Sequence, residues 1–266
     1  MVKNITVVAV TTVNHELTKR AIDRTTSQCH CTEVLVASDK DFYSGSSYVK
    51  IDQNFDIGHY NDFMLKQLVD YVNTDYALIV QYDGMAVNKH LWTDSFLDYD
   101  YTGAPWFWMP VNCQVGNGGF SLRSRRLLEK LAELEYDSQT SEDQVICQLN
   151  RAGLESLGCK FAPTDLAHRF SHEREAGWYA SFGFHGGFNI PFYLDYAGIK
   201  EYIQLVENRT SPNQLEIIPY CYAKGYLDLA DLGIELGRQS DKQFDDKFGQ
   251  YLQDNSSRFN FLLNQV

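Results

Sequence analysis

The stretch "ALIVQYDGM", residues 77–85, carries the clearest structural signal in the chain. Four apolar residues, typical of a buried strand, are followed at once by the polar segment "QYDG". Open α/β sheets bind ligands at the carboxyl ends of their strands, so we expect Asp83 at the edge of a ligand crevice. An Asp before a Gly is also common in ordinary turns, so this residue alone does not decide between the two interpretations.

The segments around this stretch predict the rest of the sheet. "NITVVAV" at 4–10 and "EVLVAS" at 33–38 are typical of buried strands, and "YNDFMLKQLVDYV" at 60–72 has a helical apolar face. Strands that alternate with helices predict a Rossmann-like α/β fold, with a mixed, mostly parallel sheet flanked by helices. From about residue 196 the chain is acidic and helical in pattern. We therefore expect a domain at 1–195 and a C-terminal helical extension at 196–266 packed on it.

Composition narrows the classes of partner. The chain has 266 residues, 44% hydrophobic, with a formal charge of -12. Such an acidic chain argues against nucleic acid or an anionic membrane as a main partner. No apolar run is long enough for a transmembrane segment and no signal-peptide pattern is present, so we expect a cytoplasmic protein. "CHC" at 29–31 lacks a second pair at zinc-ligand spacing, so we expect reduced thiols there.

Three further segments carry candidate chemistry. "SEDQ" at 141–144 predicts a capping box that places Glu142 and Asp143 in the first turn of a helix, where either could be a general base. A carboxylate there also suits the helix dipole, and the local sequence does not choose between the two acids. "FGFHGG" at 182–187 presents His185, which could share Mn²⁺ or Mg²⁺ with Asp83 or be a hydrogen-bonded loop histidine. "VGNGGF" at 115–120 permits close backbone approach to a ligand. Trp106 and Trp108 could stack on sugars or belong to the core.

Taken in order, these motifs resemble a known family. "LIVQYDG", "FLDYDYTGAPW", "VGNGGFSLRS", "EDQVIC", "FSHE" and "FGFHG" occur between about residues 55 and 190. The set resembles an uncharacterised-domain family of GT-A-like glycosyltransferases from bacteria and large viruses. It is similar, more distantly, to inverting galactosyl- and N-acetylglucosaminyltransferases of the GT-A fold.

The resemblance implies a glycosyltransferase that moves a sugar from a nucleotide-diphosphate donor, such as a UDP-sugar, to a hydroxyl of a glycan or glycoconjugate, with inversion. It gives Asp83 and His185 the metal, Asp143 the role of base and Glu142 a contact with the acceptor. The acceptor would stack on Trp106 and Trp108. The implied donor-binding residues are Thr11, Ser38, Asp39, Tyr60, Asn61, Asp83, Gly118 and Gly119.

One departure from the pattern opens an alternative. Gln81 stands where the usual Asp-x-Asp metal motif has its first carboxylate. Metal independence is therefore an alternative, in which Lys66 or Arg123 would help neutralise the phosphate charge.

Two other functions also remain open: a catalytically silent carbohydrate- or nucleotide-binding module, and a retaining transferase in which Asp143 is not the base. The C-terminal helices could pack on the domain or form a homo-oligomer. All versions of the site require Asp83, His185 and the acid pair at 142–143 to meet at one edge of the sheet.

Overall fold

The computed structural model describes residues 4–110, 113–174, 180–257 and 259. The chain divides into two compact units, Met1–His185 and Gly186–Val266. The sequence pattern placed the division after residue 195 instead. Gly186 follows the last strand of the first unit with φ +99, a conformation that favours glycine.

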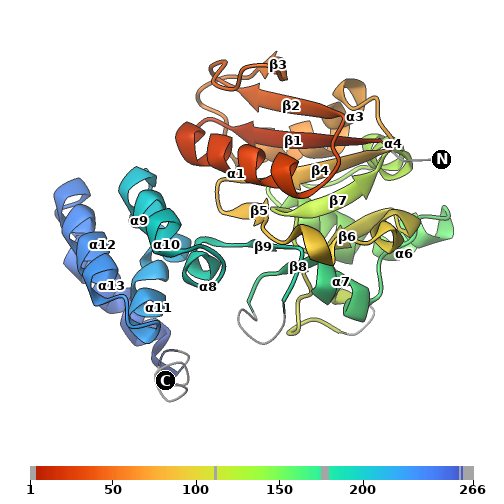
Figure 1. The fold of residues 1–266 in the computed structure, drawn as a ribbon. Helices are drawn as coiled ribbons and strands as arrows, with labels where there is room; N and C mark the ends of the chain where they lie inside the picture. Colours follow the sequence, from red (N-terminus) through yellow and green to blue (C-terminus); the bar gives the residue numbers. More distant parts are fainter. Residues whose placement is uncertain (1–3, 111–112, 175–179, 258, 260–266) are drawn as a thin grey trace. The chain divides into compact units, whose positions relative to one another are not determined.

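The first unit is built on a six-stranded sheet in the order β3-β2-β1-β4-β7-β6 (Figure 1). The strands are β1 Ile5–Thr11, β2 Glu33–Ser38, β3 Ser47–Lys50, β4 Tyr76–Val80, β6 Tyr101–Gly103 and β7 Ser121–Ser124. The first four strands in this order run parallel, and β7 and β6 are antiparallel to their neighbours. The expected mixed, mostly parallel α/β fold is confirmed.

Helices cover both faces of this sheet because the central strands are apolar on both sides. Along β1, Val8 and Val10 pack into one core and Val7 and Ala9 into the other, as the two-residue period of a strand requires. The second core also receives α1 (His15–Gln28) through Ile22. The first receives α4 (Arg125–Ala132) together with the helical segments α2 Ile57–Asp62, η1 Phe63–Gln67 and α3 Leu68–Tyr71.

A second, three-stranded sheet lies at the end of β4 and has the order β5-β9-β8. Its strands are β5 Gly84–Ala86, β9 Gly183–His185 and β8 Ser171–His172. The antiparallel pairing of β5 with β9 sets Gly84 opposite His185. The remaining elements of this unit are η2 Lys89–Leu91, η3 Asp94–Asp98, α5 Glu142–Gln144, η5 Val145–Leu149, α6 Arg151–Ser156 and α7 Thr164–Phe170.

The described part of the second unit is helical, as the sequence predicts for the C-terminal region. Its elements are η6 Gly187–Asn189, α8 Ile190–Tyr193, α9 Tyr196–Leu205, α10 Pro212–Leu215, α11 Ile217–Ala223, α12 Leu227–Ser240 and α13 Phe244–Asp254. Gly233 of α12 lets Ile218 of α11 approach closely, since a Cβ there would lie 3.1 Å from the Ile218 side chain. Across the described residues, no helix combines the length and apolarity that a membrane crossing requires.

Candidate active site

The site begins at the carboxyl end of β4, where the chain turns sharply into β5. The backbones of Gln81 and Gly84 bond to each other in both directions, at 3.0 and 2.9 Å. This tight turn holds Asp83 with only 2% of its surface exposed. The polar residue that ends the buried strand is therefore fixed by local backbone geometry.

His185 reaches the same turn through the pairing of β5 with β9. Its Nε2 atom lies 3.7 Å from Asp83 Oδ1 and 3.1 Å from Gln81 Oε1. Its Nδ1 atom lies 3.8 Å from Glu173 Oε1. Burial by itself lowers the pKa of His185, but the carboxylates of Asp83 and Glu173 outweigh it and raise the pKa to about 8. The two nearby acids therefore favour the charged form of the imidazole.

The glycine-rich segment joins His185 to the acid pair. Asn117, in the left-handed region at φ 55, places its Nδ2 atom 2.9 Å from His185 Nδ1. The next backbone amide, Gly118 N–H, donates to Asp143 Oδ2 at 3.1 Å. Two adjacent residues of the glycine-rich segment therefore hold the two side chains: Asn117 contacts His185 and Gly118 contacts Asp143.

Gly118 and Gly119 are both required because neighbouring side chains pack directly against their backbone. A Cβ on Gly119 would lie 2.1 Å from His185 Nε2, and one on Gly118 would lie 2.0 Å from Glu142 Oε1. No side chain larger than hydrogen fits at either position without moving His185 or Glu142. These contacts place Asp83, His185 and the acid pair around one glycine-rich segment.

The two adjacent acids have different environments. Glu142 is 5% exposed and accepts a 2.7 Å hydrogen bond from Nη2 of Arg123, which is fully buried. Burial and the neighbouring Asp143 raise the pKa of Glu142, although Arg123 opposes this. Asp143 is half-buried. Of the pair, Asp143 is the carboxylate that a substrate can reach.

The capping box expected in this segment does not form. Ser141 makes no side-chain cap hydrogen bond, and its hydroxyl instead donates to Asp143 Oδ1 at 2.8 Å. The Gln144 backbone N–H donates to the same Oδ1 atom at 2.8 Å. These two hydrogen bonds and the one from Gly118 orient the Asp143 carboxylate. The Ser141 hydroxyl therefore binds Asp143 and does not cap the helix.

A cavity of about 280 Å³ adjoins the cluster at the ends of β1 and β4. Its lining includes Thr11, Thr12, Phe55, Tyr60, Gln81 and Tyr82. Gln81 connects the cavity to the charged cluster. Its Nε2 atom donates to the Tyr60 hydroxyl at 3.0 Å, and its Oε1 atom faces His185. A ligand in the cavity would meet the charged cluster at Gln81.

The family of the chain follows from its sequence. Residues 47–185, more than half of the chain, match a family profile described as "Protein of unknown function (DUF5672)". The chain belongs to the DUF5672 family. The match runs from the first residue of β3 to His185, the last residue of the first unit.

Two solved structures are similar to the chain at low sequence identity. One is "Mannosyltransferase PcManGT from Pyrobaculum calidifontis in complex with GDP-Man and Mn2+", 9% identical with a TM-score of 0.46, covering 100% of this chain and 79% of that one. The other is the bifunctional IspDF from Campylobacter jejuni, also 9% identical, with a TM-score of 0.37, covering 60% of this chain and 48% of that one. No curated protein sequence matches the chain.

Several residues predicted for the site of this DUF5672 protein lie elsewhere or act indirectly. Lys66 Nζ donates to the backbone carbonyls of Ala132, at 3.1 Å, and Leu134, where α4 ends and its last carbonyls need donors. Arg123 is enclosed in the core with Glu142 and Ser121. Both side chains are therefore engaged away from the cavity.

Three other predicted donor residues support the site without lining the cavity. The Asn61 side chain donates to the carbonyls of Ser138 and Thr140 at 2.7 and 2.9 Å, and accepts the Glu142 backbone N–H. It therefore anchors the loop that leads to the acid pair. Ser38 is the last residue of β2 and Asp39 follows it. Asp39 Oδ1 lies 2.7 Å from His15 Nε2 and accepts from the Ser38 hydroxyl.

The two tryptophans differ in exposure. Trp106 is 5% exposed and donates through Nε1 to Glu173 Oε2 at 2.9 Å, whereas Trp108 is 60% exposed. The rings stack with their centroids 6.3 Å apart. Glu173 links Trp106 to His185. This residue was not predicted from the sequence, because nothing in the short motif "FSHE" indicates either partner.

Metal ligands are few in this site. The described residues contain no group of three or more His, Cys, Asp or Glu side chains arranged to hold a metal ion. Asp83 and His185 offer one oxygen and one nitrogen ligand, with the Gln81 amide oxygen beside them. A cation there would need further ligands from its substrate and from water.

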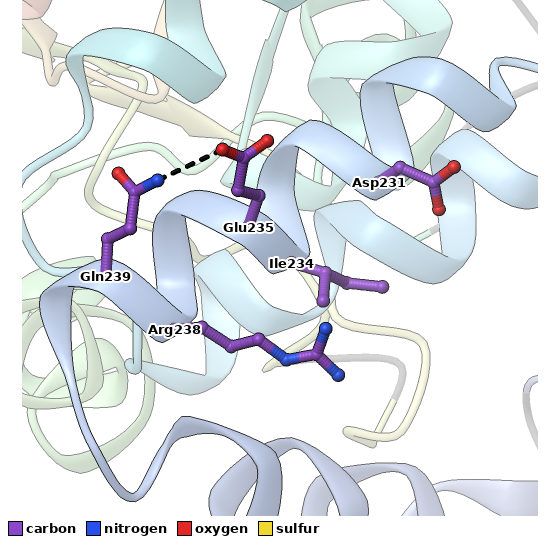
Figure 2. Close-up of a pocket in the computed structure, with 5 residues that line it drawn as sticks. All are labelled: Asp231, Ile234, Glu235, Arg238 and Gln239. Carbon is purple, nitrogen blue, oxygen red and sulfur yellow. Dashed lines mark hydrogen bonds between the residues drawn. The ribbon is translucent and has the colours of Figure 1, made fainter.

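The second unit has a cavity of its own, of about 450 Å³, along α12 (Figure 2). Its lining residues Asp231, Ile234, Glu235, Arg238 and Gln239 all project from that single helix. Gln239 Nε2 donates to Glu235 Oε1 at 3.1 Å, which is a one-turn contact on the helix surface. The polar groups do not converge from separate elements, so this surface lacks the character of a catalytic pocket.

Proposed function

We propose that this protein is a glycosyltransferase that uses a nucleotide-diphosphate sugar as donor and inverts the anomeric configuration. The observation that carries the proposal is the meeting of Asp83, Asp143 and His185 around the Gly118–Gly119 backbone, beside a cavity at the carboxyl ends of β1 and β4. The two glycines allow His185 and Glu142 to pack directly against that backbone. The order of the sequence motifs, which resembles GT-A-like glycosyltransferases, supports the same reaction class.

The cavity would take the nucleoside of the donor. Phe55 and Tyr60 supply aromatic surface and Thr11 a hydroxyl at the end of β1. Because Gln81 joins the cavity to His185, the diphosphate would lie next to the imidazole. A protonated His185 would then donate a hydrogen bond to the phosphate oxygens, where negative charge develops as the leaving group departs. We infer uridine diphosphate as the nucleotide by analogy with the GT-A galactosyl- and N-acetylglucosaminyltransferases that the sequence motifs resemble.

Asp143 would act as the general base. Its carboxylate is held by Ser141, Gln144 and Gly118 and is the accessible member of the acid pair. It would take the proton from the acceptor hydroxyl while that oxygen bonds to the anomeric carbon. The bond from that carbon to the diphosphate oxygen breaks on the opposite face, so configuration inverts. Glu142, paired with Arg123, would position the segment rather than touch the acceptor.

If the reaction uses a metal, Asp83 and a deprotonated His185 would hold a Mn²⁺ or Mg²⁺ ion, and this role would replace the hydrogen bond from His185 to the phosphate. When bound, such an ion would neutralise charge on the diphosphate. The thin set of protein ligands predicts weak binding in the absence of nucleotide. On the acceptor side, the exposed Trp108 offers a ring face for a sugar, whereas the buried Trp106 would support it through their stacking.

The test is Asp143→Asn, assayed with a panel of nucleotide sugars and glycan acceptors. We expect transfer to fall by roughly 10²-fold or more while uridine diphosphate binding in calorimetry changes little. Asp246→Asn is the matched control, because Asp246 is an exposed acid in the first turn of α13. Near-normal turnover by Asp143→Asn would reject the base assignment.

The same assays distinguish an inverting transferase from the two alternative functions. A silent binding module would bind nucleotide yet neither transfer nor hydrolyse any donor. A retaining transferase would give a product with the donor's anomeric configuration, which nuclear magnetic resonance of the product reads directly. Assays with Mn²⁺, with Mg²⁺ and with a chelator would establish whether a metal takes part.

A further inference from the structure

A pair of cysteines lies outside the candidate active site, where α1 ends and the chain turns toward β2. Cys29 follows the last residue of α1, and Cys31 lies two residues further along the chain. Their Sγ atoms are 3.0 Å apart, so the sulfurs are in direct contact. Both residues are half-buried and are flanked by the exposed residues His30 and Thr32, which leaves the pair open to a reagent.

The other cysteines provide a comparison within the same chain. Cys147, Cys159 and Cys221 are buried, and Cys113 is half-buried like the pair. All six are free thiols in the structure. Among the described residues, the sulfur–sulfur contact at Cys29 and Cys31 is the one that brings two thiols within reach of bonding.

We propose that Cys29 and Cys31 form a redox-active dithiol, a modification site that is oxidised reversibly to an intrachain disulfide by small-molecule disulfides. A disulfide bond is about 2.05 Å long, so the two sulfurs need to approach by only about 1 Å. The proposal does not depend on the transferase function.

The chemistry is a two-step thiol–disulfide exchange. One cysteine, as its thiolate, attacks a sulfur of the reagent disulfide, which forms a mixed disulfide and releases one reagent thiolate. The second cysteine thiolate then attacks the mixed disulfide at the protein sulfur and releases the other. Two cysteine sulfurs are oxidised, one reagent disulfide is reduced to two thiols, and the two protons from the cysteines go to those thiols.

The pair adjoins the last turn of α1, which is hydrogen-bonded to the end of β5 and to the segment after it. The Thr25 hydroxyl oxygen accepts from the Ala86 backbone N–H at 3.1 Å, and Gln28 Oε1 accepts from the Lys89 backbone N–H at 3.0 Å. Cys29 Sγ itself donates to the Thr25 carbonyl oxygen at 3.4 Å. Oxidation would therefore act on a helix end that is already tied to the strand after Asp83.

The experiment exposes the full-length wild-type protein to oxidised glutathione, blocks remaining thiols with an alkylating reagent and digests with trypsin. Both cysteines fall in one tryptic peptide, residues 25–40, after Arg24 and ending in Lys40. We expect this peptide to lose two hydrogens and to resist alkylation, and a dithiol reductant to restore both. The pair should oxidise about tenfold faster than Cys113 forms a mixed disulfide.

Two variants sharpen the result. In Cys31→Ser, Cys29 has no partner to displace the reagent, so we expect a stable glutathione adduct on Cys29 in place of the closed form. Cys113→Ser, the matched control, should leave oxidation of the pair unchanged. A wild-type peptide that keeps two alkylatable thiols, or that carries stable glutathione adducts without closing, overturns the proposal. Because the deciding measurement uses the wild-type chain, no outcome depends on the folding of a variant.

Discussion

Two regions of this protein place an arginine beside a carboxylate, and they differ in burial. At the candidate active site the side chains of Arg123 and Glu142 are 0% and 6% exposed, whereas those of Arg238 in α12 and Asp245 in α13 are 61% and 63% exposed. Water screens the second pair, so either partner can be lost at little cost. The first pair has no water to replace a lost partner. The two ion pairs contain the same kinds of residue, and the difference in burial makes Arg123–Glu142 structurally important and Arg238–Asp245 dispensable.

The largest expected effect comes from breaking the buried pair. Arg123→Met leaves Glu142 as an uncompensated charge against the Gly118 segment. We expect the free energy of unfolding to fall by about 3–5 kcal/mol in urea denaturation. Arg238→Ala, the exposed counterpart, should change it by less than about 0.5 kcal/mol. Equal losses in the two variants would remove the distinction between the regions.

Replacing a glycine by alanine, which adds one methyl group, should have a smaller effect on the free energy of unfolding. The sign of that effect should differ between two positions. Gly119→Ala puts a Cβ within 2.1 Å of His185 Nε2, whereas Gly153→Ala in α6 meets no atom within 4 Å. We expect the first to lower the free energy of unfolding by about 1–3 kcal/mol and to weaken nucleotide binding in calorimetry. The second should raise it by about 0.5–1 kcal/mol because alanine favours the helix. A tolerated Gly119→Ala with unchanged binding would contradict the close packing of this segment.

A third effect depends on pH and tests an ion pair of intermediate exposure. Asp100 has a 7% exposed side chain and pairs with the 53% exposed Arg126. Burial alone would raise the pKa of Asp100, but hydrogen bonds from Arg126, Ser124 and the Lys160 backbone lower it below the ordinary 3.8. The folded state therefore favours the ionised carboxylate, and this contribution is present above about pH 4 and disappears as pH falls through the lowered pKa.

Asp100→Asn measures that contribution. We expect it to lower the free energy of unfolding by about 1–2 kcal/mol near neutral pH. The difference from wild type should stay constant down to about pH 5 and shrink toward about pH 3. Urea denaturation at several pH values provides the measurement, and a difference that does not change with pH would show that ionisation of Asp100 contributes nothing.

Much of the fold was predictable because its signals are local. The apolar runs at 7–10, 34–37 and 77–80 are uninterrupted, so the strands and their carboxyl ends could be placed directly. The sites of Lys66 and Trp106 were not predictable in the same way. Lys66 is bound by carbonyls at the end of α4, and Trp106 is covered and hydrogen-bonded to Glu173. Those partners lie more than sixty residues away in the chain.

The sequence by itself determined the strands, the edge of the sheet where polar residues gather and the residue types available there, because burial and turn preferences act over a few neighbouring residues. The tertiary structure decided which atoms meet. The pairing of β5 with β9 brings His185 to Asp83, and the Gly118 amide selects Asp143 while Arg123 occupies Glu142. Only the packing of distant segments sets these partners, because a hydrogen bond depends on distances that no local pattern encodes.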